Sequence, residues 1–486
     1  MLNNSTVGPF IKSIKREITG TKFENKVYIV GGCCRDQLLG KSITDIDVVV
    51  NLPNGGIDLA NFLYEKKLLL TAPIVYETCG TVKFRLLTGI EVEAVYTRSE
   101  EYVERDKRNP KVKFGTLEED AKRRDFTMNA IYYNISGLFY YDPLNGKSNI
   151  QSKIIKTTDD PDIIFNEDPL RILRAVRFAT TLKGFEIEET TLEGMKKNVS
   201  RLQILPSERV AKELNDILLS EDTVRGLKIL EKIGALFWIH PYFHEMANLT
   251  QNKYHVGTVW EHTLMVLENL PKKDNNTYPV VKTFYGELKW AALLHDIGKI
   301  TTKTVDESGK VHFIGHEIES EKLAEEILRY FHTPANTTLR TVKFLVREHM
   351  RFKHYKTDLS DLKRKKLRHF LYYKCVNRWF VELLVCLVDS DNISHAEGYN
   401  LEGQAQELSR LIEGEKDWIY YTLPITGNDI MKIKKIPQGK LIAGYEEYVL
   451  SILMSKYQHP QEISKDTIIK ILEGATLNNI KEQYKK

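Results

Sequence analysis

The chain has 486 residues, of which 42% are hydrophobic and 28% are charged, which is ordinary for a folded protein of about three domains. Its 70 basic and 66 acidic residues leave a formal charge of +4, which is only weak evidence for a polyanionic partner. Five scattered cysteines exclude a disulfide framework and a zinc ribbon and are compatible with a reducing cytoplasm. Because no apolar run reaches about 18 residues and the N-terminus lacks signal-peptide features, a secreted or membrane protein is not expected.

The first 150 residues are rich in β signals, and the rest of the chain is helical in pattern. Alternating and β-branched runs predict strands at 27–30, 45–50, 81–87, 90–96 and 130–134. From residue 166 onward, apolar residues at helical spacing predict helices at 169–179, 208–219, 260–270, 288–294, 318–330 and 380–388. The sequence therefore predicts an α+β head followed by a long all-helical body. We expect four regions, at 1–150, 151–245, 246–400 and 401–486.

The first candidate site follows the strand at 27–30, where Gly31 and Gly32 precede a short helix that begins near Arg35. Paired glycines let backbone amides approach a phosphate group closely, and a guanidinium supplies a charged fork for phosphate oxygens. Neither GxxxxGK[ST] nor GxGxxG occurs, which disfavours a P-loop ATPase and a Rossmann dehydrogenase.

The next strand carries Asp45 and Asp47, whose carboxylates at period two lie on one face. Two carboxylates so placed can hold a pair of Mg²⁺ ions. A third carboxylate is expected from the strand at 90–96. Glu91 and Glu93 share a face there, and we favour Glu93.

Three further motifs occur downstream, Arg123-Arg-Asp-Phe-Thr-Met-Asn-Ala130, Asp142-Pro-Leu-Asn-Gly146 and Glu167-Asp-Pro-Leu-Arg171. With the Gly-Gly and Asp-x-Asp segments they resemble the nucleotidyltransferase superfamily of DNA polymerase beta. The closest resemblance is to bacterial-type (class II) tRNA nucleotidyltransferases, or CCA-adding enzymes, and their poly(A) polymerase relatives. The match covers most of residues 20–220. It implies a polymerase-beta-like head with a small mixed sheet, followed by an all-helical neck, body and tRNA-binding tail.

The resemblance also implies an activity. It predicts a cytoplasmic enzyme that adds CCA to the 3′ end of tRNA without a template, from CTP and ATP, with release of pyrophosphate and with Mg²⁺ at the head. By the same resemblance, Asp125 and Asn129 hold the incoming ribose, and Arg123 and Arg124 hold the triphosphate or the base. Small polar groups suit ribose hydroxyls and guanidinium groups suit a triphosphate.

Asp168 and Arg171 are three residues apart, and we expect them to share one helix face. A carboxylate and a guanidinium can face the amino group and ring nitrogen that cytosine and adenine share, whereas guanine and uracil place an oxygen against the carboxylate. In the family, the matching positions choose C and A. Arg174, one turn on, is a candidate to fix the pair or to touch the nucleotide.

Two local features refine this interpretation. The charged segment Ser99–Pro110 lacks a core-like period and could be a plain surface loop. In the family, a loop here permits the switch from C to A, and its full length in this chain favours complete CCA addition. The family usually has an aspartate three residues after Gly146, where this chain has Asn149, so the local turn contact is left open.

The helical body holds His262, the pair His295-Asp296, and the late aspartates Asp389 and Asp391, in an order that resembles HD metal-dependent phosphohydrolases. Imidazole and carboxylate ligands suit Mn, Ni, Zn or Fe. Residues two apart on a helix point in different directions, which favours Asp391 over Asp389. The resemblance implies the ligands His262, His295, Asp296 and Asp391, with His316 and His349 where two-metal members place extra ligands.

Several alternatives stay open at this point. A poly(A) polymerase or an A-adding enzyme would share the head motifs. A protein of another class would use the HD site as a phosphohydrolase on nucleotides or on RNA ends with a 2′,3′-cyclic phosphate. The expected partners are tRNA, ATP and CTP without a membrane, and the sequence does not decide between a monomer and a homodimer. Basic stretches at 363–368 and 432–435 could contact phosphates or be solvated helix faces.

Overall fold

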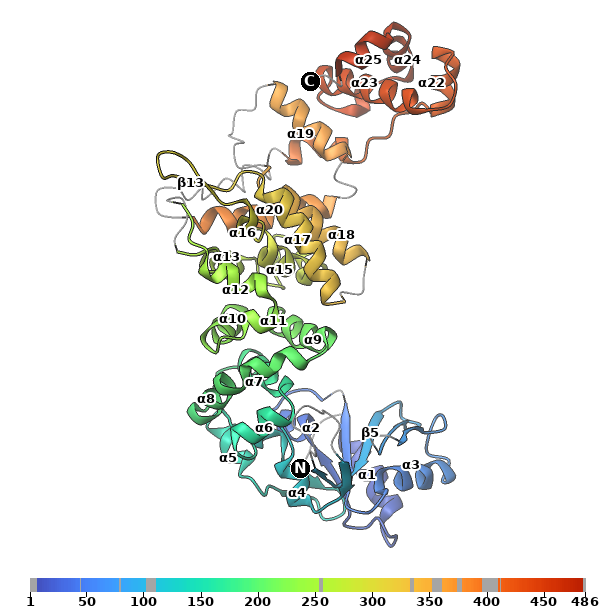
Figure 1. The fold of residues 1–486 in the computed structure, drawn as a ribbon. Coiled ribbons are helices and arrows are strands. Elements are labelled where there is room, and N and C mark those ends of the chain that lie inside the picture. The colour runs from blue at the N-terminus through green and yellow to red at the C-terminus, as the bar shows by residue number, and fades with distance from the viewer. Residues whose placement is uncertain are drawn as a thin grey trace. The chain divides into compact units, whose positions relative to one another are not determined.

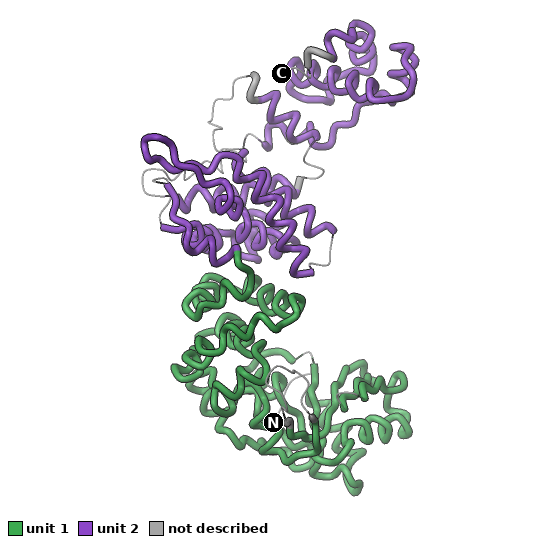
Figure 2. Tube along the Cα trace, in the orientation of Figure 1, with its two compact units in different colours: residues 1–241 green, residues 242–486 purple. Residues whose placement is uncertain are grey.

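The computed structural model describes residues 7–43, 45–77, 80–101, 111–252, 257–332, 336–351, 361–373, 378–395, 410 and 412–483. They form two compact units, Met1–Pro241 and Tyr242–Lys486 (Figure 2). The large sheet lies in the first unit. In its described residues, the second unit is helical apart from a small hairpin of β12 (Thr304–Val305) and β13 (Val311–His312).

Seven strands form one mixed sheet in the order β3-β4-β5-β2-β1-β8-β9. This sheet, in which β5 is labelled, belongs to the part of the ribbon coloured blue to teal (Figure 1). β2 and β5 run parallel, and the other neighbours are antiparallel. The strands are β1 (Val27–Val30), β2 (Ile46–Val50), β3 (Ile74–Tyr76), β4 (Thr81–Arg85), β5 (Glu91–Tyr96), β8 (Tyr132–Asn134) and β9 (Phe139–Tyr141).

The sequence predicted five of these strands and not β3 or β9. It also did not predict the separate hairpin of β6 (Arg98–Glu101) and β7 (Lys111–Phe114). β8 begins two residues later than predicted, because Thr127–Asn129 form a 3-10 turn that ends at Ala130. The rest of the charged segment expected to be a loop, residues 102–110, lies outside the described residues.

The two faces of the sheet differ in polarity. Val82, Phe84, Val92 and Ala94 are buried, and they alternate with charged side chains on the other face. Helix α3 (Gly55–Glu65) covers the apolar face so closely that a Cβ on Gly56 would lie 2.9 Å from the backbone of Ala94. The opposite face, which carries the charged side chains, is not covered by α3.

Helices account for most of the remaining first unit. They are α1 (Val7–Ile18), α2 (Gly32–Leu38), α4 (Leu117–Lys122), α5 (Gly146–Gln151), α6 (Pro161–Glu167), α7 (Leu170–Thr181), α8 (Glu189–Asn198), α9 (Ser207–Leu218), α10 (Thr223–Lys232) and α11 (Leu236–Ile239). The predicted helices at 169–179 and 208–219 correspond to α7 and α9, which pack against each other.

The second unit begins within α12 (Pro241–Asn248). Its further helices are α13 (Val259–Asn269), α14 (Val280–Thr283), α15 (Tyr285–Leu294), α16 (Lys299–Thr302), α17 (His316–Tyr330), α18 (Asn336–Glu348), α19 (Asp361–Tyr373), α20 (Arg378–Ile393), α22 (Gly427–Lys434), α23 (Lys440–Lys456), α24 (Lys465–Gly474) and α25 (Leu477–Gln483). A separate apolar core around Trp418 and Val449 holds the last four together. Among the described residues, no helix is both long and apolar enough to cross a membrane. The α+β head and helical remainder agree with the prediction.

Candidate active site and candidate metal centre

A row of charged side chains crosses the open face of the sheet. In the strand register, Asp47 of β2 is beside Glu93 of β5, and Glu93 is beside Lys83 of β4. Asp45 precedes β2 by one residue, and Asp45, Asp47, Glu91 and Glu93 all line an open cleft of about 550 Å³. The structure therefore brings the predicted carboxylates together.

The two candidates for the third carboxylate have different partners. Glu93 Oε2 is 3.1 Å from Lys83 Nζ, and Glu91 pairs with Arg85. Only Glu93 is in register with Asp47, which agrees with the preference for Glu93. Burial raises the pKa of Asp47, Arg124 opposes this, and Glu93 and Asp45 add to the rise. An all-oxygen group of crowded carboxylates has the chemistry that a divalent cation such as Mg²⁺ requires.

Gly31 fixes the backbone beside Asp47. Its φ is +76°, and a Cβ at this position would lie 3.3 Å from Asp47 Oδ2. Any other residue would be strained in this conformation and would also press on the carboxylate. Helix α2 begins at Gly32 rather than near Arg35, so Arg35 lies in its middle.

Four predicted nucleotide-binding residues form one continuous hydrogen-bond chain. Arg35 Nη1 donates to Asn129 Oδ1 at 2.9 Å, and Asn129 Nδ2 donates to Asp125 Oδ1 at 2.9 Å. Arg174 Nε and Nη2 both donate to Asp125 Oδ2, at 2.9 and 2.6 Å. Burial alone would raise the pKa of Asp125, but Arg174 and Asn129 outweigh it and lower the pKa to about 2. Asp125 is therefore a fixed anion that links the head to α7.

Asp120 is a residue that the sequence interpretation missed. Its fully buried carboxylate accepts from Arg123 Nη2 at 2.6 Å, from Arg124 Nη2 at 2.9 Å and from the Tyr132 hydroxyl at 2.7 Å. Both predicted triphosphate-binding arginines are thus held by one carboxylate on α4. Their spacing from Asp120, three and four residues along the chain, is the signal that could have revealed it.

Asp168 differs from its predicted position. It was expected on one helix with Arg171, but it lies between α6 and α7 in an extended conformation, with φ −137° and ψ 98°. The reason is Pro169, which disfavours helical geometry in the residue before it. Asp168 Oδ1 instead accepts from the Leu170 amide at 3.1 Å, and Oδ2 is 3.4 Å from Arg209 Nη2.

Arg171 is 8% exposed and is bound separately from Asp168. It donates to the Ile164 carbonyl at 3.1 Å, to Glu167 Oε2 at 3.0 Å and to the Arg123 carbonyl at 2.6 Å. In the described contacts it does not pair with Asp168, so the ordinary helical salt bridge is not formed. Asn149, where the family has aspartate, donates from Nδ2 to Thr127 Oγ1 at 2.7 Å.

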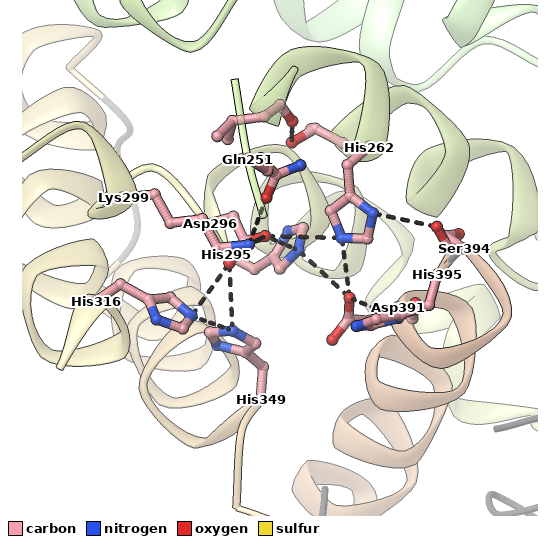
Figure 3. A network of polar contacts seen from close by, with 12 residues as sticks. Gln251, His262, His295, Asp296, Lys299, His316, His349, Asp391, Ser394 and His395 are labelled. Carbon is pink, nitrogen blue, oxygen red and sulfur yellow. Dashed lines mark hydrogen bonds and ion pairs between the residues drawn. The ribbon is translucent and has the colours of Figure 1, made fainter. Parts of the chain in front are cut away.

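The second constellation lies in the second unit, where six predicted residues form two groups (Figure 3). One group is His262, His295 and Asp391, and the other is Asp296, His316 and His349. Within each group the candidate ligand atoms lie within 4.8 Å of one another, and all six residues are buried. Asp391 is in this site and Asp389 is not part of either group.

Asp296 stands between the two groups. Its Oδ1 is 3.2 Å from His316 Nε2, and its Oδ2 is 3.3 Å from His295 Nε2. Lys299 Nζ also donates to Oδ2 at 2.6 Å. Burial would raise the pKa of Asp296, but Lys299 and His295 outweigh burial and lower it well below the usual range. One ionised carboxylate thus offers an oxygen to each group.

The histidine tautomers fit metal binding. Nδ1 of His295, His316 and His349 lies 2.7–2.8 Å from a backbone carbonyl oxygen, which only accepts hydrogen bonds. Nδ1 must therefore carry a proton in each, and Nε2 is the ring nitrogen left to bind a metal ion. His316 Nε2 and His349 Nε2 are 3.3 Å apart. His295 Nε2 is buried and forms no hydrogen bond of normal geometry with the described residues, although Asp296 Oδ2 is 3.3 Å away. Cations between these nitrogen atoms and the carboxylates would satisfy them.

The two basic stretches contribute residues to packing. Arg368 is buried against Glu415, with Nε donating to Oε2 at 2.6 Å, and it also donates to the carbonyls of Met454 and Tyr457. Lys434 Nζ donates to the carbonyls of Leu472 and Ala475 at the end of α24. These two cations are used within the tail.

Three family models match the chain. They are described as the poly A polymerase head domain, over residues 27–156, the probable RNA and SrmB-binding site of polymerase A, over 184–246, and the HD domain, over 259–376. The carboxylates of the sheet lie within the first matched segment, and five of the six residues of the second constellation lie within the third. Asp168, Arg171, Arg174 and Asp391 lie outside the three segments.

Known proteins with similar sequences differ in the nucleotides that their names say they add. An A-adding tRNA nucleotidyltransferase of Deinococcus radiodurans is 34% identical over 240 residues, 48% of this chain and 52% of the relative, so the chain spans about half the length of that relative. A CC-adding tRNA nucleotidyltransferase of Thermus thermophilus is 29% identical over 84% of this chain and 85% of the relative. A multifunctional CCA protein of Actinobacillus pleuropneumoniae is 30% identical over 62% of this chain and 70% of the relative.

Solved structures extend the likeness to nearly the whole chain. The crystal structure of the Bacillus stearothermophilus CCA-adding enzyme in complex with CTP has a TM-score of 0.63 and is 20% identical, covering 99% of this chain and 100% of that chain. At this identity the likeness shows the fold.

Proposed function

The chain belongs to the tRNA nucleotidyltransferase family that includes the CCA-adding enzymes, and on this premise we propose that it adds complete CCA to the 3′ end of tRNA from CTP and ATP. One observation carries the proposal: the glycine turn joins the carboxylates to the nucleotide-binding network, because a Cβ on Gly31 would lie 3.3 Å from Asp47 Oδ2 and one on Gly32 would lie 3.4 Å from Arg35 Nη2. The full length of the segment at 99–110 favours all three additions over addition of CC alone.

The head supplies binding and orientation for nucleotidyl transfer. Mg²⁺ held by Asp45, Asp47 and Glu93 would activate the tRNA 3′-hydroxyl and neutralise the leaving pyrophosphate. Arg123 and Arg124, held by Asp120, offer guanidinium groups to the triphosphate. In the reaction the 3′-oxygen bonds to the α-phosphorus, the bond to the β-phosphate oxygen breaks, and the hydroxyl proton passes to water.

The nucleotide is held by the network that starts at the glycine turn. Gly31 and Gly32 let the triphosphate approach the backbone, and Arg35 stands behind them, already oriented by Asn129. Asp125 and Asn129 present oxygen and nitrogen atoms to the ribose hydroxyls. Because these groups are already bonded to one another, little ordering remains when nucleotide binds.

Asp168 and Arg171 select the base in this proposal. Arg171 is fixed by three hydrogen bonds, and the Asp168 carboxylate accepts from the Leu170 amide, so each side chain is held separately before the nucleotide arrives. Arg174 acts through Asp125. A base with an oxygen in place of the amino group would leave the carboxylate unpaired, which costs on the order of 100-fold in selectivity.

Nucleotide competition tests base selection. The Asp168→Ala variant and the wild type are given tRNA ending in CC with ATP or GTP, and kcat/KM is measured for each. The proposal expects the preference for ATP over GTP to fall by at least about tenfold in the variant. An unchanged preference would refute the assignment. Glu193→Gln on α8, an exposed position, is the matched control.

A second activity is favoured by the six-residue centre. The mixed nitrogen and oxygen ligands suit Mn, Ni, Zn or Fe. Metal ions held by the two groups, to each of which Asp296 offers an oxygen, would polarise a phosphate ester and supply a bound hydroxide. We propose that this centre hydrolyses phosphate esters, including 2′,3′-cyclic phosphates at RNA ends. Two transition-metal ions per chain are expected by elemental analysis, and fewer than one would refute the proposal. His349→Gln should halve the metal content per chain, whereas His312→Gln, in the hairpin strand β13 outside the centre, should leave the metal content unchanged.

Other parts of the proposal concern setting and organisation. We propose a cytoplasmic location, which is compatible with a tRNA substrate. Within the two compact units, we propose a catalytic head over 1–150, a neck over 151–245, an HD domain over 246–400 and a tRNA-binding tail over 401–486. A poly(A) polymerase on the same scaffold is the alternative, and the length of the product separates the two.

A further inference from the structure

The row through Asp47 continues beyond the carboxylates. After Glu93 it reaches Lys83 on β4, and Lys83 is in register with Ile74 on the edge strand β3. Neighbouring residues of one row point to the same face of the sheet. The face thus presents, in order, two carboxylates, an ammonium group and an apolar side chain.

This end of the face is open. The Lys83 side chain is 54% exposed and β3 is exposed throughout, including Ile74 and Tyr76, which share the face of Lys83. Ile74, Lys83 and Arg85 line the same cleft as the carboxylates. An exposed apolar edge strand would be a liability unless something covers it.

The nucleotide-binding groups lie on the other side of Asp47. Val30 of β1 is in register with Asp47, and Gly31 and Arg124 lie next to it on that side. In phosphoryl transfer the attacking and leaving oxygens are in line across the phosphorus. If the triphosphate lies toward β1, the attacking hydroxyl must arrive from the side of β5, β4 and β3.

The chemistry of the cleft suits the end of an RNA strand. Single-stranded RNA is bound by cations that contact phosphates and by apolar or aromatic surfaces that contact bases. Lys83, Arg85 and Ile74 line the cleft and supply two cations and an apolar surface. Tyr76, exposed at the end of β3 on the same face as Ile74, extends this surface. Arg85 is paired with Glu91 one row away, whereas Lys83 is beside Glu93 and two positions from Asp47. Lys83 is therefore the cation closest in the row to the reacting centre.

We propose that Lys83 and the exposed strand β3 bind the 3′-terminal segment of the RNA substrate. The ammonium group of Lys83 neutralises Glu93 before substrate binds, and it pairs with the phosphate of the terminal nucleotide once a divalent cation is bound by the carboxylates. Ile74 and Tyr76 contact the preceding base. This inference rests on the proposed function, because it assigns the site at which the tRNA end is held.

Steady-state kinetics on the full chain test the inference. Wild type, Lys83→Met and Lys83→Arg are assayed with tRNA ending in CC and with ATP, each varied in turn, at three salt concentrations. Lys83→Met keeps the aliphatic stem and removes the charge. We expect the KM for tRNA to rise about 3- to 10-fold, and the KM for ATP to stay within about twofold. The slope of log kcat/KM for tRNA against log salt should become less negative by about 0.7.

The controls separate charge from folding. Lys83→Arg should return the KM for tRNA to within about twofold of wild type. Lys22→Met removes a similarly exposed lysine that pairs with Asp58 of α3, the helix that covers the other face of the sheet, and it should change neither KM. A rise in the KM for ATP instead, or a Lys83→Met variant indistinguishable from wild type, would overturn the inference.

A failure of the proposed function would be recognised separately. If the wild type does not extend tRNA at all, that proposal has failed, and equilibrium binding then decides this one. Fluorescently labelled tRNA ending in CC is titrated with wild type and Lys83→Met in Mg²⁺ without nucleotide. The same 3- to 10-fold weakening supports the site, and equal affinities refute it.

Discussion

The buried carboxylate of Asp120 provides the sharpest test of the head's architecture. It is fully buried and holds Arg123, Arg124 and Tyr132 through hydrogen bonds of 2.6–2.9 Å to Nη2 of each arginine and the tyrosine hydroxyl. Asp120→Asn keeps the shape but replaces the anion with a neutral amide whose NH₂ group faces other donors. Two guanidinium groups are then left without their shared counter-ion. Breaking a buried pair in this way costs about 3–5 kcal/mol of unfolding free energy.

The assay must report on the first unit alone. Urea titrations followed by hydrogen exchange of peptides from β1 and β8 provide this, because both strands lie in that unit. Glu193→Gln is the control, since Glu193 forms an exposed pair with Lys196 at 2.6 Å. Exposed pairs contribute about 0–1 kcal/mol. A loss in Asp120→Asn no larger than that in the control would refute the account.

The difference in unfolding free energy between wild type and Asp120→Asn should depend on pH in a defined direction. Burial would raise the pKa of Asp120, but Arg124 and Arg123 outweigh it and hold the pKa well below its usual range. A carboxyl group whose pKa is lower in the folded than in the unfolded chain stabilises the folded state at pH values above its unfolded pKa of about 4. This stabilisation is lost as the pH falls below that value. The gap between wild type and Asp120→Asn should therefore be constant from pH 7 to pH 5 and narrow only below about pH 4.

Three further predictions concern other positions. Gly31→Ala should lower the rate of nucleotide transfer at least about 100-fold in a product assay, because its Cβ would press on Asp47. Gly40 has a similar φ of +69° but open space around it, so Gly40→Ala should lose stability without losing transfer. Burial lowers the pKa of Lys289 to about 8 from 10.5, so the unfolded chain binds the proton more tightly between these values and stability rises with pH there. Lys289→Met should thus be more stable than wild type by about 1–2 kcal/mol at pH 7 in urea titrations, with the gap closing toward pH 10. His349→Gln should leave the rate of CCA addition unchanged, since the carboxylate row contains no histidine.

The five strands at 27–30, 45–50, 81–87, 90–96 and 130–134 and the shared face of the candidate carboxylates could be predicted because their signals are local. Alternation places Asp45 and Asp47 together, and helical spacing separates Asp389 from Asp391. Register between strands is not a local property. Only the parallel pairing of β2 and β5 sets Glu93 rather than Glu91 beside Asp47, and no pattern in the sequence fixes that pairing.

Some differences between the predicted and the observed structure could have been recognised from a local sequence pattern, and others could not. Pro169 directly follows Asp168, and this alone could have placed Asp168 outside the helix. β3 has three residues and no buried side chain, so it lacked the alternation by which strands are recognised. The spacing of Asp120 from Arg123 and Arg124 was a signal for their pairing, but Asp120 stands among other acidic residues in α4, and its burial depends on Tyr132 from a distant strand. Tertiary contacts decided both of these cases.

A sized-product assay tests the central claim most directly. Purified chain and Mg²⁺ are mixed with tRNA ending at the discriminator base, in C or in CC, and each receives CTP, ATP or both. The account predicts growth by three, two and one nucleotides respectively when both are present, and no further growth. Extension only of the CC-ending tRNA by A, an arrest after CC, or a ladder of A residues on any RNA would contradict it.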